Sequence, residues 1–264
     1  MDSSQGVRPI ALITGATVGI GAAFAELLAR ENHDLVIVAR DLARLNERAA
    51  EWQSKFGVQV EVMQADLSRD EDIRRLELRL QNISRPIEVL VNNAGFGINK
   101  SFMKSDTAEE IALLDVLVTA PMRLMHAVLP SMKSRNSGVI INVSSIAAWI
   151  AGGSYSAAKS YLTVLTESLH AELMGTNVKV HALCPGFTRT EFHQRGGMKM
   201  GAVPSWMWST ADEVVNEAWK AANAGKAISV PGKAYKVISM ISRFGPRPFV
   251  RKMGMNVRVR QRQK

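Results

Sequence analysis

Short apolar runs alternate with amphipathic stretches along the chain. Residues 9–15, PIALITG, form an apolar run that ends in glycine and predicts a buried strand, whereas 20–31 has the apolar spacing of a helix. The alternation continues and predicts further strands at 34–40, 58–66, 87–95, 138–145, 178–186 and 226–232, and further helices at 41–56, 69–83, 107–135, 153–175 and 210–225. Asp41 is the expected N-cap of the second helix, and Pro121 is a point at which the long fourth helix could break.

Strands that are apolar throughout and separated by helices are typical of a parallel sheet covered on both faces. Right-handed crossovers then give a doubly wound sheet. The sequence therefore predicts an α/β fold with a doubly wound seven-stranded parallel sheet, arranged in three αβα layers as a single domain.

Length and composition agree with one large domain. The chain has 264 residues, of which 47% are hydrophobic and 22% charged, ordinary values for a globular protein. Its single cysteine, Cys184, excludes an internal disulfide and fits a reducing compartment. The N-terminus lacks the pattern of a signal peptide, and we expect no membrane span, because no run of about 18 apolar residues is evident. A cytoplasmic protein is the expectation.

Basic residues are concentrated at the C-terminal end. The formal net charge is +9, and the last acidic residue, Glu217, is followed by 12 of the 33 Lys and Arg residues. This contrast divides the chain into a domain at 1–232 and a basic extension at 233–264. The extension mixes apolar and basic residues, so it could be an ordered subdomain with a basic end or a segment that lies on an anionic membrane. A nucleic-acid partner is not expected, because no nucleic-acid-binding motif is present.

Ligands of doubly wound sheets bind at the carboxyl ends of the strands. The first strand ends in TGATVGIG, where Gly15, Gly19 and Gly21 permit a tight turn, and the next helix offers backbone N–H groups to a pyrophosphate. Thr17 and Ile20 belong to the same turn and to the same expected cofactor site. The alternative is a glycine-rich turn without a ligand.

The second strand ends in Ala39 and Arg40, where an NAD site usually has an acidic residue. An arginine pairs with a 2′-phosphate, which favours NADP(H) over NAD(H), and a solvent-facing arginine is the alternative. After the third strand Asp66, with Leu67 beside it, could bond an adenine amino group or cap the following helix.

Two further strand ends complete the expected cofactor site. Small residues after the fourth strand let a ribose approach the backbone, and a turn after the sixth strand precedes a threonine that could bond a nicotinamide carboxamide. The residues concerned are Asn93, Ala94 and Gly95 in the first group, and Pro185, Gly186 and Thr190 in the second.

A candidate catalytic pair follows the fifth strand. Tyr155 and Lys159 are four residues apart, so they share one face of a helix. A nearby ammonium favours the phenolate and lowers the pKa of a tyrosine, which would then exchange a proton with a carbonyl or alcohol oxygen. Ser144 or Ser145 could hold the same oxygen. The five histidines lack metal-ligand spacing, and we predict no metal.

Taken in order, TGATVGIG, NNAG, NVSS, YSAAK and PGFTRT resemble the short-chain dehydrogenase/reductase family. The resemblance implies a Rossmann-type sheet and hydride transfer between a nicotinamide and a carbonyl or alcohol carbon. It implies that Tyr155 is the acid/base, that Lys159 binds the ribose hydroxyls and lowers the tyrosine pKa, and that Ser145 positions the substrate oxygen. It also implies a homo-dimer or tetramer.

The chain departs from the family pattern at two positions. Leu117 stands where members often have an asparagine that supports a water chain behind the lysine. Ser145 precedes Tyr155 by 10 residues, whereas the family spacing is longer. A dinucleotide-binding regulatory protein with weak catalysis or none, peripheral to a membrane, is therefore the alternative function.

The segment expected to choose the substrate is about 190–210. It is rich in apolar side chains, and Gly196 and Gly197 could form the hinge of a lid. The apolar positions are Met198, Met200, Val203, Trp206, Met207 and Trp208. They predict a small apolar carbonyl or alcohol substrate, with packing against the core as the alternative.

Overall fold

A seven-stranded sheet forms the centre of the computed structural model, which describes residues 8–192, 197, 204–252 and 254. The strands are β1 (Ile10–Thr14), β2 (Asp34–Ala39), β3 (Val60–Gln64), β4 (Ile87–Asn92), β5 (Gly138–Val143), β6 (Val178–Leu183) and β7 (Ile228–Ser229). Their order is β3-β2-β1-β4-β5-β6-β7 and every neighbouring pair is parallel. The order reverses between β1 and β4, so the ligand crevice of such a sheet lies at their carboxyl ends.

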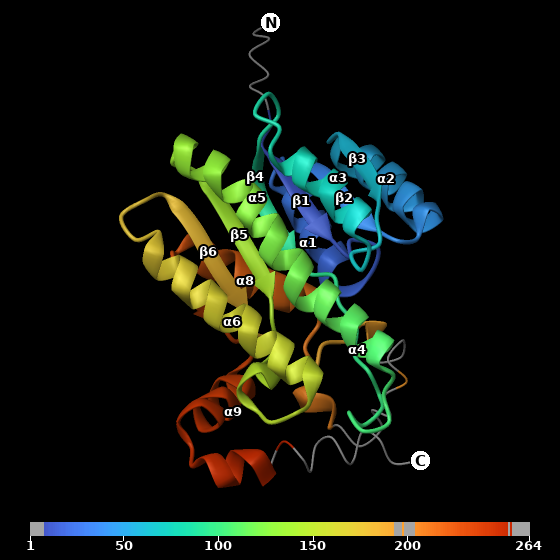
Figure 1. The fold of residues 1–264 in the computed structure, drawn as a ribbon. Helices are drawn as coiled ribbons and strands as arrows, with labels where there is room; N and C mark the ends of the chain where they lie inside the picture. Colours follow the sequence, from blue (N-terminus) through green and yellow to red (C-terminus); the bar gives the residue numbers. More distant parts are fainter. Residues whose placement is uncertain (1–7, 193–196, 198–203, 253, 255–264) are drawn as a thin grey trace, which may run out of the picture.

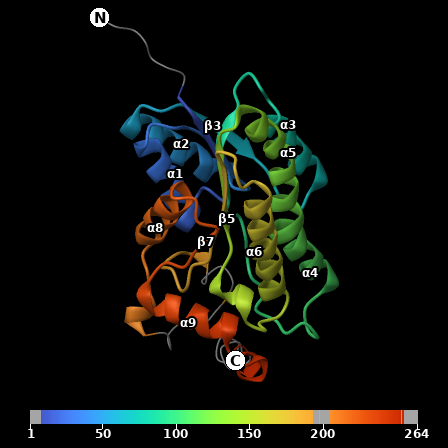
Figure 2. The same ribbon diagram turned by 90° about the vertical axis from the view of Figure 1, so that its left-hand side faces the viewer.

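Helices cover both faces of the sheet (Figures 1 and 2). On one face lie α1 (Gly19–Arg30), α2 (Leu42–Phe56) and α8 (Ala211–Asn223), and on the other lie α3 (Asp70–Leu80), α5 (Ala120–Arg135) and α6 (Ser154–Glu172). The expected Asp41 cap is present, because its carboxylate accepts a hydrogen bond from the Arg44 N–H over 3.1 Å. The predicted three-layer fold is confirmed.

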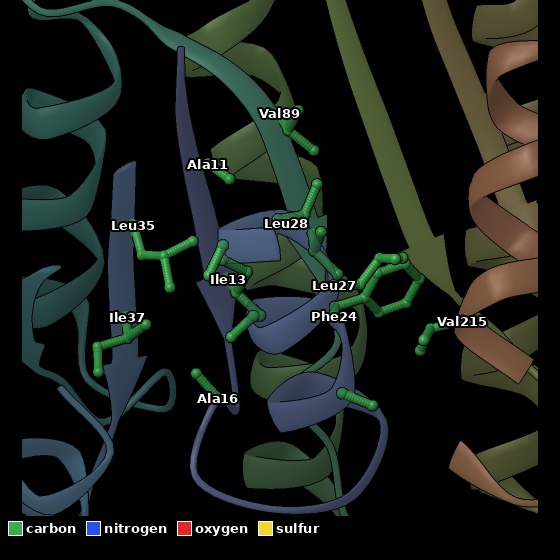
Figure 3. Packing of buried hydrophobic residues seen from close by; sticks show 14 of the residues in the cluster. Ala11, Ile13, Ala16, Phe24, Leu27, Leu28, Leu35, Ile37, Val89 and Val215 are labelled. Carbon is green, nitrogen blue, oxygen red and sulfur yellow. The ribbon is translucent and has the colours of Figure 1, made fainter. Parts of the chain in front are cut away.

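Each layer boundary is filled by its own apolar cluster. Between the sheet and α1 the cluster includes Ile13, Phe24 and Leu28, all fully buried (Figure 3). A second cluster, with Leu12, Leu90 and Leu124, fills the opposite side. Neighbouring positions on β1 thus face opposite layers, which explains why the strand is apolar throughout.

The long helical region does not break at Pro121. It runs through α4 (Thr107–Leu114), a π-helical segment η1 (Asp115–Thr119) and α5. Proline has no N–H to donate to the carbonyl four residues before it. Pro121 is the second residue of α5 and follows the π-helical segment, in which the regular hydrogen-bond pattern already changes. The region 107–135 is also long and apolar enough to cross a membrane, by length and composition alone, and 44% of its most apolar window is buried in the protein.

The C-terminal extension begins as an ordered helix. α9 (Lys233–Phe244) lies across the carboxyl end of the sheet, against the 3-10 turn η2 (Ile146–Trp149) (Figures 1 and 2). Tyr235 is only 2% exposed there. The part of the extension that the structure describes is therefore packed on the sheet domain.

Candidate active site

The ends of β1 and β4 are joined by side-chain hydrogen bonds. The Thr14 hydroxyl oxygen accepts from the backbone N–H groups of Asn93 (3.0 Å) and Ala94 (3.1 Å). The Asn93 amide donates in return to the carbonyls of Thr14 (2.9 Å) and Gly15 (3.1 Å). These bonds hold the two turns on either side of the crevice in a fixed relation.

Glycine is required in the first turn for two different reasons. Gly15 and Gly19 have φ angles of 68° and 60°, in the left-handed region that side chains disfavour. A Cβ on Gly21 would lie 2.2 Å from the Gly15 carbonyl oxygen, so Gly21 lets the start of α1 pack against the turn. The result is a helix N-terminus with an open approach to its backbone N–H groups.

The end of β2 presents cations to the crevice. Arg40 is exposed, borders the cavity and forms no ion pair within the described part of the chain. Arg44, which sequence reasoning missed, borders it too, and its guanidinium lies 3.2 Å from the Glu191 carboxylate. Its position one turn into α2, directly after the strand end, was the signal that could have indicated it.

Asp66 stabilises its own turn. Its carboxylate accepts hydrogen bonds from the Ser68 backbone N–H (3.0 Å) and hydroxyl (2.7 Å). It does not cap α3, whose N-cap is Arg69. Asp66 also borders the cavity.

Tyr155 and Lys159 lie one turn apart on α6 and face the carboxyl end of β5. Lys159 is 4% exposed and its Nζ donates to the Val143 carbonyl oxygen over 2.6 Å. The same Nζ lies 5.8 Å from the centre of the Tyr155 ring. The ring of Phe192 covers the tyrosine at 6.0 Å.

The two serines after β5 have different surroundings. Ser144 is buried and its hydroxyl bonds the Lys159 carbonyl (3.0 Å) and the Thr163 hydroxyl (2.6 Å). Ser145 and Tyr155 both border the cavity, and the Ser145 hydroxyl acts to lower the pKa of the Tyr155 phenol. Ser145 also accepts from the Ala147 N–H over 3.1 Å and so begins the turn η2. Ser145 is thus the serine that shares the cavity with the tyrosine.

Burial sets the ionisation of the pair. It raises the pKa of Tyr155 to about 12, and the contact with Ser145 only partly offsets this. It lowers the pKa of Lys159 to about 8. The expected lowering of the tyrosine pKa by the neighbouring ammonium is therefore wrong for the protein alone, because desolvation of the phenolate is the larger effect.

Leu117 fills the position behind Lys159 with hydrocarbon. It is fully buried within η1, and a Cβ on Gly95 would lie 2.8 Å from its Cδ2. A cavity of about 10 Å³ remains between Leu117, Lys159 and Asn92, close to the smallest space that holds one water molecule. No water chain of several molecules fits there.

A cavity of about 1020 Å³ connects these features. It is bordered by every predicted site residue except Gly21: Gly15, Thr17, Gly19, Ile20, Arg40, Asp66, Leu67, Asn93, Ala94, Gly95, Ser145, Tyr155, Lys159, Pro185, Gly186 and Thr190. Thr190 packs over Gly19, since a Cβ there would lie 2.9 Å from its side chain. The strand ends therefore form one continuous site.

The residues of this cavity fit a nicotinamide dinucleotide. One end offers the N-terminus of α1 beside a glycine turn that has no side chains to obstruct a pyrophosphate. The other end holds Tyr155 and Lys159. Within the described residues no cluster of three or more His, Cys, Asp or Glu side chains could bind a metal.

Helix α9 supplies a wall that sequence reasoning missed. Tyr235 packs on Gly186, where an added Cβ would lie 2.1 Å from the ring. Its hydroxyl accepts from the Phe187 N–H (3.0 Å) and donates to the Met207 carbonyl (2.5 Å). Ile238 and Ser242 border the cavity from the same face of α9. The spacing of these residues was visible in the sequence, but not the surface that they cover.

The predicted lid is described only in part. Gly196, Met198, Met200 and Val203 lie outside the described residues. Met207 borders the cavity, Trp208 lies against Phe187 with ring centres 5.8 Å apart, and Trp206 is exposed. Of the three predicted apolar positions that the structure describes, Met207 and Trp208 thus contribute to the cavity or to its wall.

Comparison with known proteins gives a consistent result. The family model "short chain dehydrogenase" matches residues 9–199. The chain is 31% identical to 17-beta-hydroxysteroid dehydrogenase type 3 of Mus musculus over 236 residues, which cover 88% of this chain and 74% of that protein.

Two solved structures share both the fold and part of the sequence. A short-chain dehydrogenase from Sphingobium yanoikuyae in complex with NADPH is 33% identical, with a TM-score of 0.81 and coverage of 97% of this chain and 98% of that chain. A bulky-bulky ketone specific alcohol dehydrogenase from Comamonas testosteroni is 28% identical, with a TM-score of 0.78 and coverage of 97% and 96%.

Proposed function

The chain belongs to the short-chain dehydrogenase/reductase family, and we propose that it is an NADP(H)-dependent oxidoreductase that interconverts an apolar carbonyl compound and its alcohol, with Tyr155 as the acid/base. The observation that carries this proposal is the meeting of Tyr155, Lys159 and Ser145 in one cavity with the glycine turn of β1. The bound cofactor supplies or accepts the hydride.

Tyr155 moves the proton. Because burial keeps its phenol protonated well above neutral pH, the hydroxyl is ready to donate to a carbonyl oxygen as that oxygen gains negative charge. Ser145 lies beside it and provides a second hydrogen bond to the same oxygen. Together they hold the carbonyl with its oxygen toward α6.

Lys159 orients the ribose and supplies a proton to the tyrosine. One Nζ proton is used by the Val143 carbonyl, which leaves two donors for ribose hydroxyls. A lysine in a dry site whose pKa is lowered to about 8 exchanges protons readily near neutral pH. It can therefore replace the proton that Tyr155 gives away.

Arg40 supports the choice of NADP(H). No carboxylate stands at position 39 or 40, where it would repel a 2′-phosphate, and the exposed guanidinium of Arg40 can pair with one. The similar enzyme from Sphingobium yanoikuyae was solved with NADPH.

The substrate end of the cavity is apolar. Phe187, Phe192, Ile98 and Ile238 border the cavity, and Phe192 and Ile98 lie near Tyr155. Such walls hold a ligand by burial of hydrocarbon. The relatives named for a hydroxysteroid and for a bulky ketone agree with a lipophilic ketone or its alcohol.

The test is turnover of apolar ketones with NADPH by wild-type protein, Tyr155→Phe and Tyr161→Phe. Tyr161 lies on the same helix but is exposed, so its variant is the matched control. We expect Tyr155→Phe to lower kcat by about 10²-fold or more while NADPH still binds, and Tyr161→Phe to act as wild type. Equal turnover by all three proteins would refute the assignment.

A dinucleotide-binding regulator is the second candidate, and Leu117 is the observation in its favour. Hydrocarbon behind Lys159 removes the water path by which a proton reaches solvent. This candidate predicts NADPH binding by calorimetry with no turnover of any ketone tested.

A further inference from the structure

Helix α9 has one face of mixed polarity toward the protein and one apolar face toward solvent. Tyr235, Ile238, Ser239 and Ser242 point inward, at i, i+3, i+4 and i+7. The opposite face has the same spacing, with Val237 60%, Met240 64%, Ile241 44% and Phe244 79% exposed.

The distribution of side chains on α9 is inverted. A helix that only covers a domain normally turns its apolar face inward and its polar face to water. Here two serines are buried, while four large apolar residues face outward. A contiguous exposed apolar stripe of this kind marks a surface that has a partner.

The charge around the stripe identifies the partner. Lys233, Arg247, Arg251 and Lys252 flank it in the sequence and are exposed, and within the described part of the chain none of them forms an ion pair. No acidic residue follows Glu217 in the sequence. A second copy of this face would bring like charges together, whereas an anionic lipid surface satisfies both the apolar stripe and the cations.

The position of α9 places this surface next to the substrate space. The helix lies across the carboxyl end of the sheet (Figures 1 and 2). Tyr235, Ile238 and Ser242, opposite the stripe, border the cavity. A bilayer in contact with the outer face would therefore lie one helix diameter from the substrate space.

We propose that α9 docks on an anionic phospholipid surface, with Val237, Met240 and Phe244 at the acyl boundary and the flanking cations on the lipid phosphates. The contact lies parallel to the membrane and does not span it. The inference goes beyond the proposed function and does not depend on it, because it rests on the outer face of α9 alone.

The test is flotation of the full chain with phosphatidylcholine vesicles and with vesicles of phosphatidylcholine and phosphatidylglycerol. Met240→Glu/Phe244→Glu places charge in the stripe at exposed positions. Leu78→Glu/Ile83→Glu is the matched control, because both residues are exposed and apolar but belong to α3 and the loop after it. A third variant, Lys233→Gln/Arg247→Gln, keeps the stripe and removes two cations.

We expect wild type and control to float with the anionic vesicles and to be released by salt. Each cation near the surface contributes roughly fivefold in affinity, so Lys233→Gln/Arg247→Gln should bind at least about tenfold more weakly. Met240→Glu/Phe244→Glu should lose flotation while it keeps the wild-type melting temperature.

Either of two results would overturn the proposal: wild type does not float with anionic vesicles, or wild type and the stripe variant float equally. If wild type does not float and the stripe variant has a different mass in light scattering, the face is a contact between copies of the chain.

Discussion

The hydroxyl of Tyr235 joins three segments that meet only in the folded protein. It lies on α9, accepts the Phe187 N–H after β6 and donates to the Met207 carbonyl in η3 (Ser205–Met207). Tyr235→Phe keeps the ring on Gly186 and removes both hydrogen bonds. The substitution therefore separates the effect of the hydroxyl from that of the packing.

The magnitude follows from the burial of Tyr235. The tyrosine is 2% exposed and its two partners are half-buried, so an N–H and a C=O lose their partner at a site that water reaches only from the cavity. A buried group left unpaired costs about 1–3 kcal/mol, and we expect Tyr235→Phe to lower the free energy of unfolding by about 2 kcal/mol. For a domain of this size that is a fall in Tm of roughly 4–8 °C.

The assay is denaturant and thermal unfolding of Tyr235→Phe beside Tyr161→Phe, whose side chain is exposed. The control should stay within about 0.5 kcal/mol of wild type. Because Phe187 and Met207 border the cavity, KM for an apolar ketone should rise while the affinity for NADPH is kept. Stability of Tyr235→Phe equal to that of the control would refute the reasoning.

Three further outcomes are expected. Arg40→Ala should weaken NADPH binding about 10- to 100-fold in calorimetry and leave NADH binding unchanged, because a charge-assisted pair contributes about 1.5–3 kcal/mol; equal losses for both would contradict the 2′-phosphate assignment. Stability should fall as pH drops below about 6.5, because burial lowers the pKa of His181, so the unfolded chain takes up a proton that the folded one rejects. Melting at pH 8 and pH 5.5 checks this, and His181→Gln should flatten the difference. Leu117→Asn should raise kcat for ketone reduction if proton supply limits it, with kcat against pH as the measurement; a lower kcat would show that hydrocarbon packing there matters more.

The fold could be predicted because its signals are local. Each central strand is buried on both faces, so its sequence is a continuous run of apolar residues, and each helix has one apolar stripe. Pro121 was misjudged because the effect of a proline depends on how the preceding turn hydrogen-bonds, and a π segment is not visible in the pattern of apolar residues.

The candidate site could be predicted where its residues follow strand ends. The carboxyl ends of parallel strands meet at one edge of the sheet, so positions as distant as Gly15 and Thr190 were expected together and do border one cavity. Tyr235 was missed because its role depends on how α9 packs over Gly186. That packing cannot be predicted from the spacing of residues in the sequence.

The ionisation of Tyr155 was misjudged for a related reason. The pair Tyr155 and Lys159 could be read from the sequence, but not how dry their surroundings are. Desolvation depends on side chains such as Phe192, which comes from a loop after β6 and covers the ring. A motif therefore identifies the groups that exchange a proton, whereas packing decides at which pH they do so.

The short connection between Ser145 and Tyr155 shows that the number of residues between two side chains does not determine whether they meet. The 10-residue separation could have moved the serine away from the phenol. Instead Ser145 begins η2, whose tight 3-10 turn leads the chain back to α6, and Gly153 with φ 81° provides the sharp entry to that helix. The serine thus stays in the cavity with Tyr155, whereas Asn142, 13 residues before Tyr155, lies in β5 and accepts a hydrogen bond from the Asn92 side-chain amide. Geometry at the end of β5, rather than the count of residues, decides which side chain reaches the substrate oxygen.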